Sequence, residues 1–218
     1  MDKKQGLLIV IEGIDGSGKT TQINLLAKRL EEQKIPHAVI SFPRYEDNIY
    51  AELVTRYLEG EFGSIHEVNP YLMALPFAGD RLLAKSVIEK WLEEGRWVLV
   101  NRYVSANKAH MGAKLPEEKR EEFFKWLNEL EYRTNGILKE DLTILLAVDP
   151  KIGQKNVAGR LPDLHEGNIK HLEEANQIYL SLAKKEANWY VVDCMKDGKM
   201  RSRDDIHQEI MRIVYDKI

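Results

Sequence analysis

A glycine-rich run near the start of the chain constrains its fold more than any other feature. The run matches the pattern G-x-x-x-x-G-K-[ST], follows the apolar residues 7–11 and precedes a helical pattern over 23–30. Between a strand and a helix, such a loop turns its backbone N–H groups inward, and the helix start adds unpaired N–H groups. The sequence therefore predicts a P-loop that binds nucleotide phosphates, made of Gly13, Ile14, Asp15, Gly16, Ser17, Gly18, Lys19, Thr20 and Thr21.

Two side chains of this loop carry the predicted chemistry. Lys19 is expected to reach the β- and γ-phosphates of the nucleotide, and the Thr20 hydroxyl is expected to ligate Mg²⁺. An ordinary glycine-rich turn between a strand and a helix is the alternative interpretation. The loop alone leaves open which nucleotide chemistry it serves.

Composition and length indicate one domain over residues 1–218, without a linker, a repeat or a low-complexity tract. A net charge of −3 argues against a general nucleic-acid binder. No apolar run approaches the roughly 18 residues of a membrane span, and the polar start lacks a signal-peptide core, so we expect a cytoplasmic protein. The single cysteine, Cys194, cannot form an internal disulfide and is expected to be a buried structural thiol rather than a nucleophile.

Five short apolar runs alternate with helical patterns along the chain. Alternation of this kind predicts a parallel sheet covered by helices on both faces, which is an α/β fold of the P-loop NTPase type in three layers. The predicted strands are 7–11, 38–42, 97–100, 142–148 and 189–192, and the main predicted helices are 49–58, 71–94, 116–134, 150–156, 168–185 and 203–217.

Two segments carry more specific expectations. Pro76 lies within the long pattern 71–94 and is expected to kink that helix or to split it in two. Residues 159–167 combine glycine, proline and charges without an apolar period, so we expect a surface segment that forms part of a short lid over about 153–167.

The absence of other motifs narrows the class of P-loop protein. A GTPase should carry N-K-x-D after a later strand, and the nearest match, Asn107-Lys108-Ala109-His110, lacks the aspartate. A motor protein needs additional domains for which the chain is too short. These absences favour a small kinase.

Four further motifs follow the P-loop in a fixed order, namely Phe42-Pro43-Arg44-Tyr45, Phe77-Ala78-Gly79-Asp80-Arg81, Asn101-Arg102-Tyr103-Val104-Ser105-Ala106-Asn107 and Asp163-Leu164-His165-Glu166. Their order and spacing resemble those of the thymidylate kinase family, whose members phosphorylate dTMP from ATP. The resemblance extends from about Leu7 to the last helix. It implies ATP as the phosphoryl donor, dTMP as the acceptor, Mg²⁺ as the cofactor and a homodimer as the assembly.

The resemblance assigns two arginines to the acceptor phosphate. Arg44 and Arg102 follow the second and third predicted strands, and the carboxyl edge of an open α/β sheet is where ligands bind. Two guanidinium groups on one phosphate offer forked donors in a fixed geometry. Participation in surface salt bridges is the alternative for each of them.

The resemblance also predicts the residues around the base. Phe77 matches an aromatic residue that stacks on thymine, Arg81 matches an arginine that hydrogen-bonds the base, and Asn107 matches a position that reads the pyrimidine edge. Tyr45 and Tyr103 match an aromatic wall. Packing in the core is the alternative for the aromatic residues, and a place on a helix surface is the alternative for Asn107.

Asp15 and the lid complete the implied site. The resemblance places Asp15 on the 3′-hydroxyl of the acceptor and near the metal. Because the P-loop has no arginine between Gly13 and Lys19, we expect the lid residue Arg160 to cover the transferred phosphoryl group, with Lys155 as the substitute. Asp163, His165 and Glu166 match a stretch near the acceptor, although these carboxylates could instead cap the following helix.

Departures from the family pattern keep some alternatives open. Asn101 stands where an aspartate is usual, Leu164 where an arginine is common and His165 where a tyrosine is common. The metal ligand Thr20 is therefore expected to act with Asp15, Asn101 or Glu166 through water. The acceptor could be another pyrimidine nucleotide or a deoxynucleoside, and the remaining alternative is a regulator that binds nucleotide without transfer.

Overall fold

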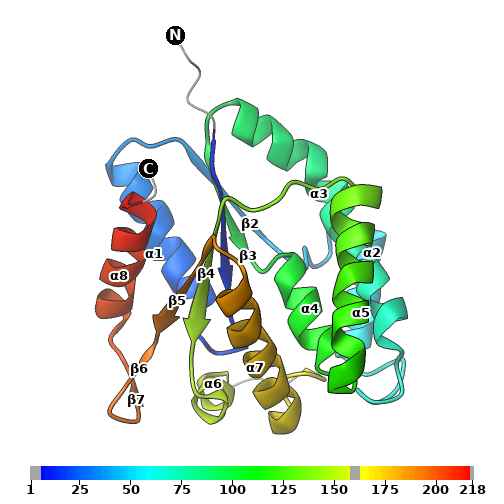
Figure 1. The fold of residues 1–218 in the computed structure, drawn as a ribbon. Helices are drawn as coiled ribbons and strands as arrows, with labels where there is room; N and C mark the ends of the chain where they lie inside the picture. The colour runs from blue at the N-terminus through cyan, green and yellow to red at the C-terminus, as the bar shows by residue number, and fades with distance from the viewer. Residues whose placement is uncertain (1–5, 158–162, 217–218) are drawn as a thin grey trace.

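A parallel five-stranded sheet forms the centre of the molecule. The computed structural model describes residues 6–157 and 163–216. The sheet has the strand order β2-β3-β1-β4-β5, and every pairing within it is parallel, which confirms the predicted architecture (Figure 1). The strands are β1 Leu8–Glu12, β2 His37–Ser41, β3 Trp97–Asn101, β4 Leu142–Ala147 and β5 Trp189–Asp193.

Helices cover both faces of this sheet, with α1 and α8 on one side and α2 to α5 on the other (Figure 1). Along β1, Ile9 and Ile11 belong to one buried apolar cluster, whereas Leu8 and Val10 belong to the other. Both faces of the strand are buried, as expected for a three-layer α/β protein. The helices are α1 Lys19–Glu32, α2 Ile49–Leu58, α3 Pro70–Glu93, α4 Val104–Gly112, α5 Glu117–Asn128, α6 Pro150–Asn156, α7 Ile169–Lys185 and α8 Arg203–Tyr215.

The predicted split at Pro76 is wrong, because α3 runs without interruption from Pro70 to Glu93. The helix begins where the sequence predicts, with the Asn69 side chain accepting from the N–H groups of Tyr71 and Leu72. An interior proline costs a helix about 3 kcal/mol. Pro76 is buried together with its neighbours Ala74 and Ala78, and this packing offsets the lost backbone hydrogen bond.

Only the first part of the helix predicted over 116–134 is an α-helix, namely α5. After α5, the chain continues as a π-helix, η1, from Glu129 to Thr134. Glu131 lies in this segment and is fully buried, although a carboxylate would ordinarily face solvent. The Phe123-Leu127 spacing predicted the apolar face of α5, but no local signal in the sequence distinguishes the π-helical turn.

A short hairpin precedes α8 and was missed. Strands β6 (Met195–Lys196) and β7 (Lys199–Met200) pair antiparallel across Asp197 and Gly198, whose φ angles are 51° and 72°. An Asp-Gly dipeptide is a recognised signal for such a two-residue turn. The sequence therefore contained enough information to predict this hairpin.

The expectation of a surface segment over 159–167 is wrong for its second half. His165 and Glu166 are buried, and Asp163 accepts hydrogen bonds from both of their backbone N–H groups at 2.9 and 2.8 Å. The aspartate thus fixes a turn that folds inward. It does not cap α7, because the cap is Asn168, whose side chain accepts from the His171 N–H at 3.1 Å. Arg160 lies outside the described residues.

Within the described part of the chain, no helix is both long enough and apolar enough to cross a membrane. Cys194 is buried, and burial raises the pKa of its thiol to about 12, which confirms a structural cysteine.

Candidate active site

The glycine-rich loop follows β1 at the carboxyl edge of the sheet and leads directly into α1. Its glycines at 13, 16 and 18 have φ angles of 143°, 73° and 93°, a region that disfavours residues with a Cβ atom. At Gly16 a Cβ atom would lie 1.9 Å from the carbonyl oxygen of Gly153 in α6. Glycine is required there both for the backbone angle and for the close approach of α6.

Lys19 lies within the loop that precedes it. Its Nζ donates to the carbonyl oxygens of Gly13 and Ile14 at 3.0 and 2.8 Å, and the side chain is buried. Burial, together with the charge of Arg102, lowers the pKa of Lys19 to about 7. Anionic phosphates in the loop would favour the charged amine.

A wide cleft opens in front of the loop and has the position of a donor-nucleotide site. The loop residues Asp15 to Thr21 line it, together with Asn101, Arg102 and Glu166. The other walls of this cleft were not predicted from the sequence. Asn156 donates to the Gly16 carbonyl oxygen at 2.9 Å, and residues Met200 to Arg203 close the far side. The Asp-Gly signal of the hairpin would have pointed to Met200.

Oxygen atoms at one end of this cleft fit Mg²⁺, which prefers such ligands. Thr20 is exposed, and its Oγ1 lies 3.4 Å from Asn101 Nδ2. The other amide atom, Asn101 Oδ1, is buried and has no hydrogen-bond partner among residues 6–157 and 163–216. An orphaned carbonyl oxygen beside a hydroxyl is suited to accept a hydrogen bond from a metal-bound water.

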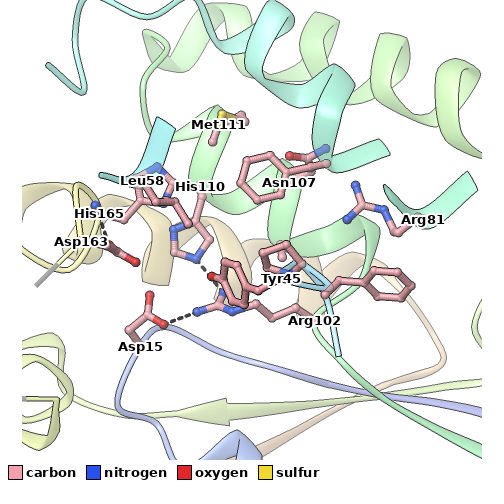
Figure 2. Close-up of a pocket in the computed structure, with 14 residues that line it drawn as sticks. Asp15, Tyr45, Leu58, Arg81, Arg102, Asn107, His110, Met111, Asp163 and His165 are labelled. Atoms are coloured by element: carbon pink, nitrogen blue, oxygen red, sulfur yellow. Dashed lines mark hydrogen bonds and ion pairs between the residues drawn. The ribbon is translucent and has the colours of Figure 1, made fainter. Parts of the chain in front are cut away.

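A second cleft lies beside the first and brings most of the predicted acceptor residues together (Figure 2). Tyr103 is absent from its walls because it is buried in the core, where its hydroxyl donates to the Leu138 carbonyl oxygen at 2.9 Å. The predicted residues that line the cleft are Asp15, Tyr45, Phe77, Arg81, Arg102, Asn107, Asp163 and His165.

Arg102 stands where the two clefts meet. It has a φ angle of 65°, forms an ion pair with Asp15 and donates from Nη1 to His110 Nε2 at 2.9 Å (Figure 2). Burial alone would raise the pKa of Asp15, but the charges of Arg102 and Lys19 outweigh burial and hold the pKa well below its usual range. Asp15 is therefore ionised at neutral pH.

Arg44 is held differently. Its Nε donates to Asp80 Oδ1 at 2.9 Å, its Nη2 donates to the Asp80 carbonyl oxygen at 3.0 Å, and its Nη1 lies 2.7 Å from Asp47. Arg44 does not line the second cleft as the described residues form it. Its contact with an acceptor phosphate stays a prediction.

The far end of the second cleft offers polar atoms for a base. Asn107 Nδ2 donates to the Ala74 carbonyl oxygen at 3.1 Å, whereas its buried Oδ1 has no partner within the described ranges. Arg81 Nε donates to both carboxylate oxygens of Glu131 at 3.1 and 3.0 Å. Phe77 lies half-buried on the same wall.

With this geometry established, comparison with known proteins decides the family. The family model described as "Thymidylate kinase" matches residues 11–210. The chain belongs to the thymidylate kinase family. As a member of that family, it is a phosphotransferase of the nucleoside monophosphate kinase type.

Individual relatives support this assignment. The chain is 30% identical over 195 residues to thymidylate kinase from Mycobacterium tuberculosis, covering 85% of this chain and 91% of the relative. It is 32% identical over 197 residues to thymidylate kinase from Nitrobacter hamburgensis, covering 86% and 80%. A solved structure of thymidylate kinase from Candida albicans has a TM-score of 0.80 at 22% identity, covering 97% of this chain and 92% of that chain, which supports the fold.

Three histidines lie together beside the acceptor cleft. Nitrogen atoms of His110, His165 and His171 lie within 4.8 Å of one another, and all three side chains are buried. Zinc sites also use histidine nitrogens. Here the rings of His110 and His165 are stacked within 5° of parallel, and His110 Nε2 already accepts from Arg102, so the group is not a formed metal centre.

Of these three histidines, only His165 was predicted from its sequence motif. His110 lies three residues after Asn107 on α4, and this spacing places the two on one face of the helix. That spacing was the available signal for His110. His171 lies in the first turn of α7, and no motif marks it.

Proposed function

We propose that this chain transfers the γ-phosphoryl group of ATP to dTMP and forms dTDP. The observation that carries the proposal is that Asp15 and Arg102 line both clefts, so a nucleotide in each would place its phosphates at these two residues. Phosphoryl transfer requires the two phosphates to meet in line, in a site that supplies positive charge. The family assignment supports ATP as donor and dTMP as acceptor.

On the donor side, the loop N–H groups hold the phosphates and Lys19 turns from the loop carbonyls toward them. Thr20 would hold Mg²⁺ directly, with Asn101 and Glu166 acting through bound water. The ion, when bound, neutralises charge on the β- and γ-phosphates. Asn101 would contribute an amide dipole rather than a charge, so the negative charge near a bound ion would come from Asp15 and Glu166.

On the acceptor side, Arg102 directs its remaining N–H groups toward the acceptor phosphate. A phosphate monoester is already anionic near neutral pH, because its second pKa is about 6. Its oxygen therefore attacks without a strong general base. The carboxylate of Asp15, held by Arg102, would accept a hydrogen bond from the 3′-hydroxyl of the acceptor.

The polarity of the far wall favours thymine over cytosine. The unpartnered Asn107 Oδ1 can accept from the N3–H of thymine, and Arg81 can donate to its O4. Cytosine presents an acceptor at N3 and an amino group at position 4, which oppose both groups. An acceptor of the thymine or uracil type is therefore preferred.

A panel of acceptors tests this proposal. In a coupled assay of ADP formation, dTMP should give turnover well above the water background, and dCMP should give at least about tenfold less because buried polar groups would be left unpaired. Asn107→Ala should raise the KM for dTMP. Turnover with dCMP or thymidine but not with dTMP would contradict the assignment, and ATP binding without ADP formation for any acceptor would favour a regulator.

We further propose Arg160 as the residue that covers the transferred phosphoryl group, because the P-loop carries no arginine. Arg160→Ala should keep ATP binding and lose much of the rate. Lys151→Ala is the matched control, since Lys151 is exposed on α6 and lines neither cleft, and Lys155→Ala tests the predicted substitute. Equal rates for wild type and Arg160→Ala would remove Arg160 from the mechanism.

We propose that the chain forms a homodimer. We also propose that it acts in the cytoplasm, where both nucleotides are available. One face of α3 leaves large apolar side chains exposed, namely Leu72, Leu75, Leu82 and Leu83 at 66%, 43%, 38% and 51%. Neighbouring apolar groups of this kind indicate an interaction surface. Leu83→Asp should convert a dimer to a monomer in light-scattering measurements, whereas Tyr215→Asp on α8 should not.

A further inference from the structure

We propose that His110 is a positioning residue that holds the guanidinium of Arg102 toward the acceptor phosphate while leaving its positive charge intact, and that His171 assists by fixing the tautomer of His110. The inference rests on the proposed function, since it concerns the acceptor phosphate. Neither histidine belongs to the motifs that identified the family.

The contacts of Arg102 show how its orientation is fixed. One terminal nitrogen, Nη2, pairs with Asp15 from the P-loop, and the other, Nη1, donates to His110 Nε2 of α4 at 2.9 Å (Figure 2). The guanidinium is thus held at both ends. Of its five N–H donors, two are used by these contacts, and three remain for a phosphate.

The direction of the hydrogen bond between Arg102 and His110 determines which nitrogen of His110 is protonated. A guanidinium is always protonated and can only donate, so His110 Nε2 must carry its lone pair. The proton of the neutral ring then lies on Nδ1, which is 3.4 Å from His171 Nε2. His171 is the acceptor that favours this tautomer, and a neighbour of this kind sets which ring nitrogen is protonated.

Burial keeps the ring in the neutral form. Burial and the charge of Arg102 lower the pKa of His110 well below its usual value, with His165 and His171 acting in the same direction and Asp15 opposing them. His165 stacks on the ring with centroids 5.1 Å apart, so water has little access to that face. His110 is therefore an acceptor without charge across the neutral range.

Neutrality is the property that distinguishes this contact from those of the other two arginines. Arg44 pairs with Asp80 and Asp47, and Arg81 pairs with Glu131, so each is held by carboxylates. A second carboxylate on Arg102 would add negative charge beside the incoming phosphate. The imidazole supplies the hydrogen bond alone, and one carboxylate, Asp15, remains as the counter-charge.

Three substitutions at position 110 separate orientation from charge. His110→Gln keeps an acceptor without charge, His110→Leu removes the acceptor, and His110→Glu keeps an acceptor but adds a negative charge. The readout is the ratio of the dissociation constants for thymidine and dTMP, which reports what the phosphate contributes to binding. Thermal melts establish that each variant is folded.

We expect the glutamine variant to keep the wild-type ratio within about threefold. The leucine and glutamate variants should lower the ratio about tenfold or more, since hydrogen bonds to charged groups are worth roughly 1.5–3 kcal/mol. The KM for ATP should stay unchanged in all three. An unchanged ratio in the glutamate variant, or an equal loss in the glutamine and leucine variants, would overturn the proposal.

The ratio of the dissociation constants for thymidine and dTMP also tests the role of His171 in fixing the tautomer of His110. His171→Gln offers an amide oxygen to the Nδ1–H of His110 and should preserve the ratio, whereas His171→Leu should lower it. His37→Gln, at the opposite end of the sheet, is the control for loss of a histidine. If wild-type protein binds thymidine and dTMP equally, the proposed function itself fails, which is distinguishable from a failure confined to these variants.

Discussion

The donor and acceptor halves of the site are built by different means. The donor half is made of backbone, in which three glycines with left-handed angles shape the loop and even Lys19 is held by loop carbonyl oxygens. The acceptor half is made of side chains from distant elements, in which each of three arginines is paired with a carboxylate. Those pairs are Arg44 with Asp80, Arg81 with Glu131 and Arg102 with Asp15.

The difference determines how each half responds to change. A backbone site tolerates little added volume, because the neighbouring main chain cannot move aside. A site made of ion pairs tolerates small changes of volume but not the loss of one charge, because the other charge is then left buried and unpaired. Substitutions that add volume should therefore damage the donor half, and substitutions that remove charge should damage the acceptor half.

The largest effect is expected at Glu131. Glu131→Gln removes the carboxylate opposite Arg81 while keeping its size, and breaking a buried ion pair in this way costs roughly 3–5 kcal/mol. Glu129→Gln is the matched control, since its pair with Arg133 lies on the same η1 segment but is exposed, and such pairs contribute at most about 1 kcal/mol. Urea unfolding measures the loss of unfolding free energy in each variant. Equal losses in the two variants would contradict the claim that the buried ion pairs of the acceptor half depend on charge.

The sequence predicted the donor half more completely than the acceptor half, because the two halves differ in how far apart their residues lie along the chain. The loop is local, so nine adjacent residues carry both its backbone shape and its chemistry. The arginine partners are separated from their arginines by 36, 50 and 87 residues, so only folding brings them together. Glu131 was beyond prediction, because a charged residue on a helix ordinarily faces solvent.

The same reasoning applies to the fold. Apolar runs such as 97–100 predicted every strand of the five-stranded sheet. The central strands β1, β3 and β4 are apolar because both of their faces are buried, whereas the edge strands β2 and β5 are only partly buried. The continuity of α3 through Pro76 was not predictable, since it depends on packing that outweighs a local penalty. The inward turn at Asp163 was missed because its composition alone resembles that of a surface loop.

A smaller effect, on ligand binding, is expected at Gly16. Gly16→Ala places a Cβ atom 1.9 Å from the Gly153 carbonyl oxygen and should weaken ATP binding about tenfold or more, because a strained loop backbone costs roughly 1–3 kcal/mol. Gly60→Ala is the control, since its φ of 83° is equally left-handed but no atom lies within 4 Å of the added Cβ. Calorimetric titration with ATP distinguishes them.

That control should lose about 1 kcal/mol of stability from its backbone angle and keep the affinity of wild type for ATP. If both glycine variants lost ATP affinity equally, the close approach of α6 would not be the cause. If neither lost affinity, the donor half would not depend on its backbone shape.

The smallest effect is the loss of stability in acid, and it is expected from the acceptor half, where His110, His165 and His171 lie. Burial, with a smaller effect from the charge of Lys114, lowers the pKa of His171 to about 4, against an ordinary value of 6.5, while Asp15 opposes the shift. Between these values the unfolded chain binds more protons than the folded one, so stability is full above pH 6.5 and falls as the pH decreases toward 4. Between pH 6.5 and pH 5, His171 should lower the free energy of unfolding by about 1.5 kcal/mol. Urea unfolding of wild type and His171→Gln at both pH values measures this decrease, and we expect a smaller decrease in the variant. An equal decrease in the two proteins would mean that His171 is not kept neutral by its surroundings.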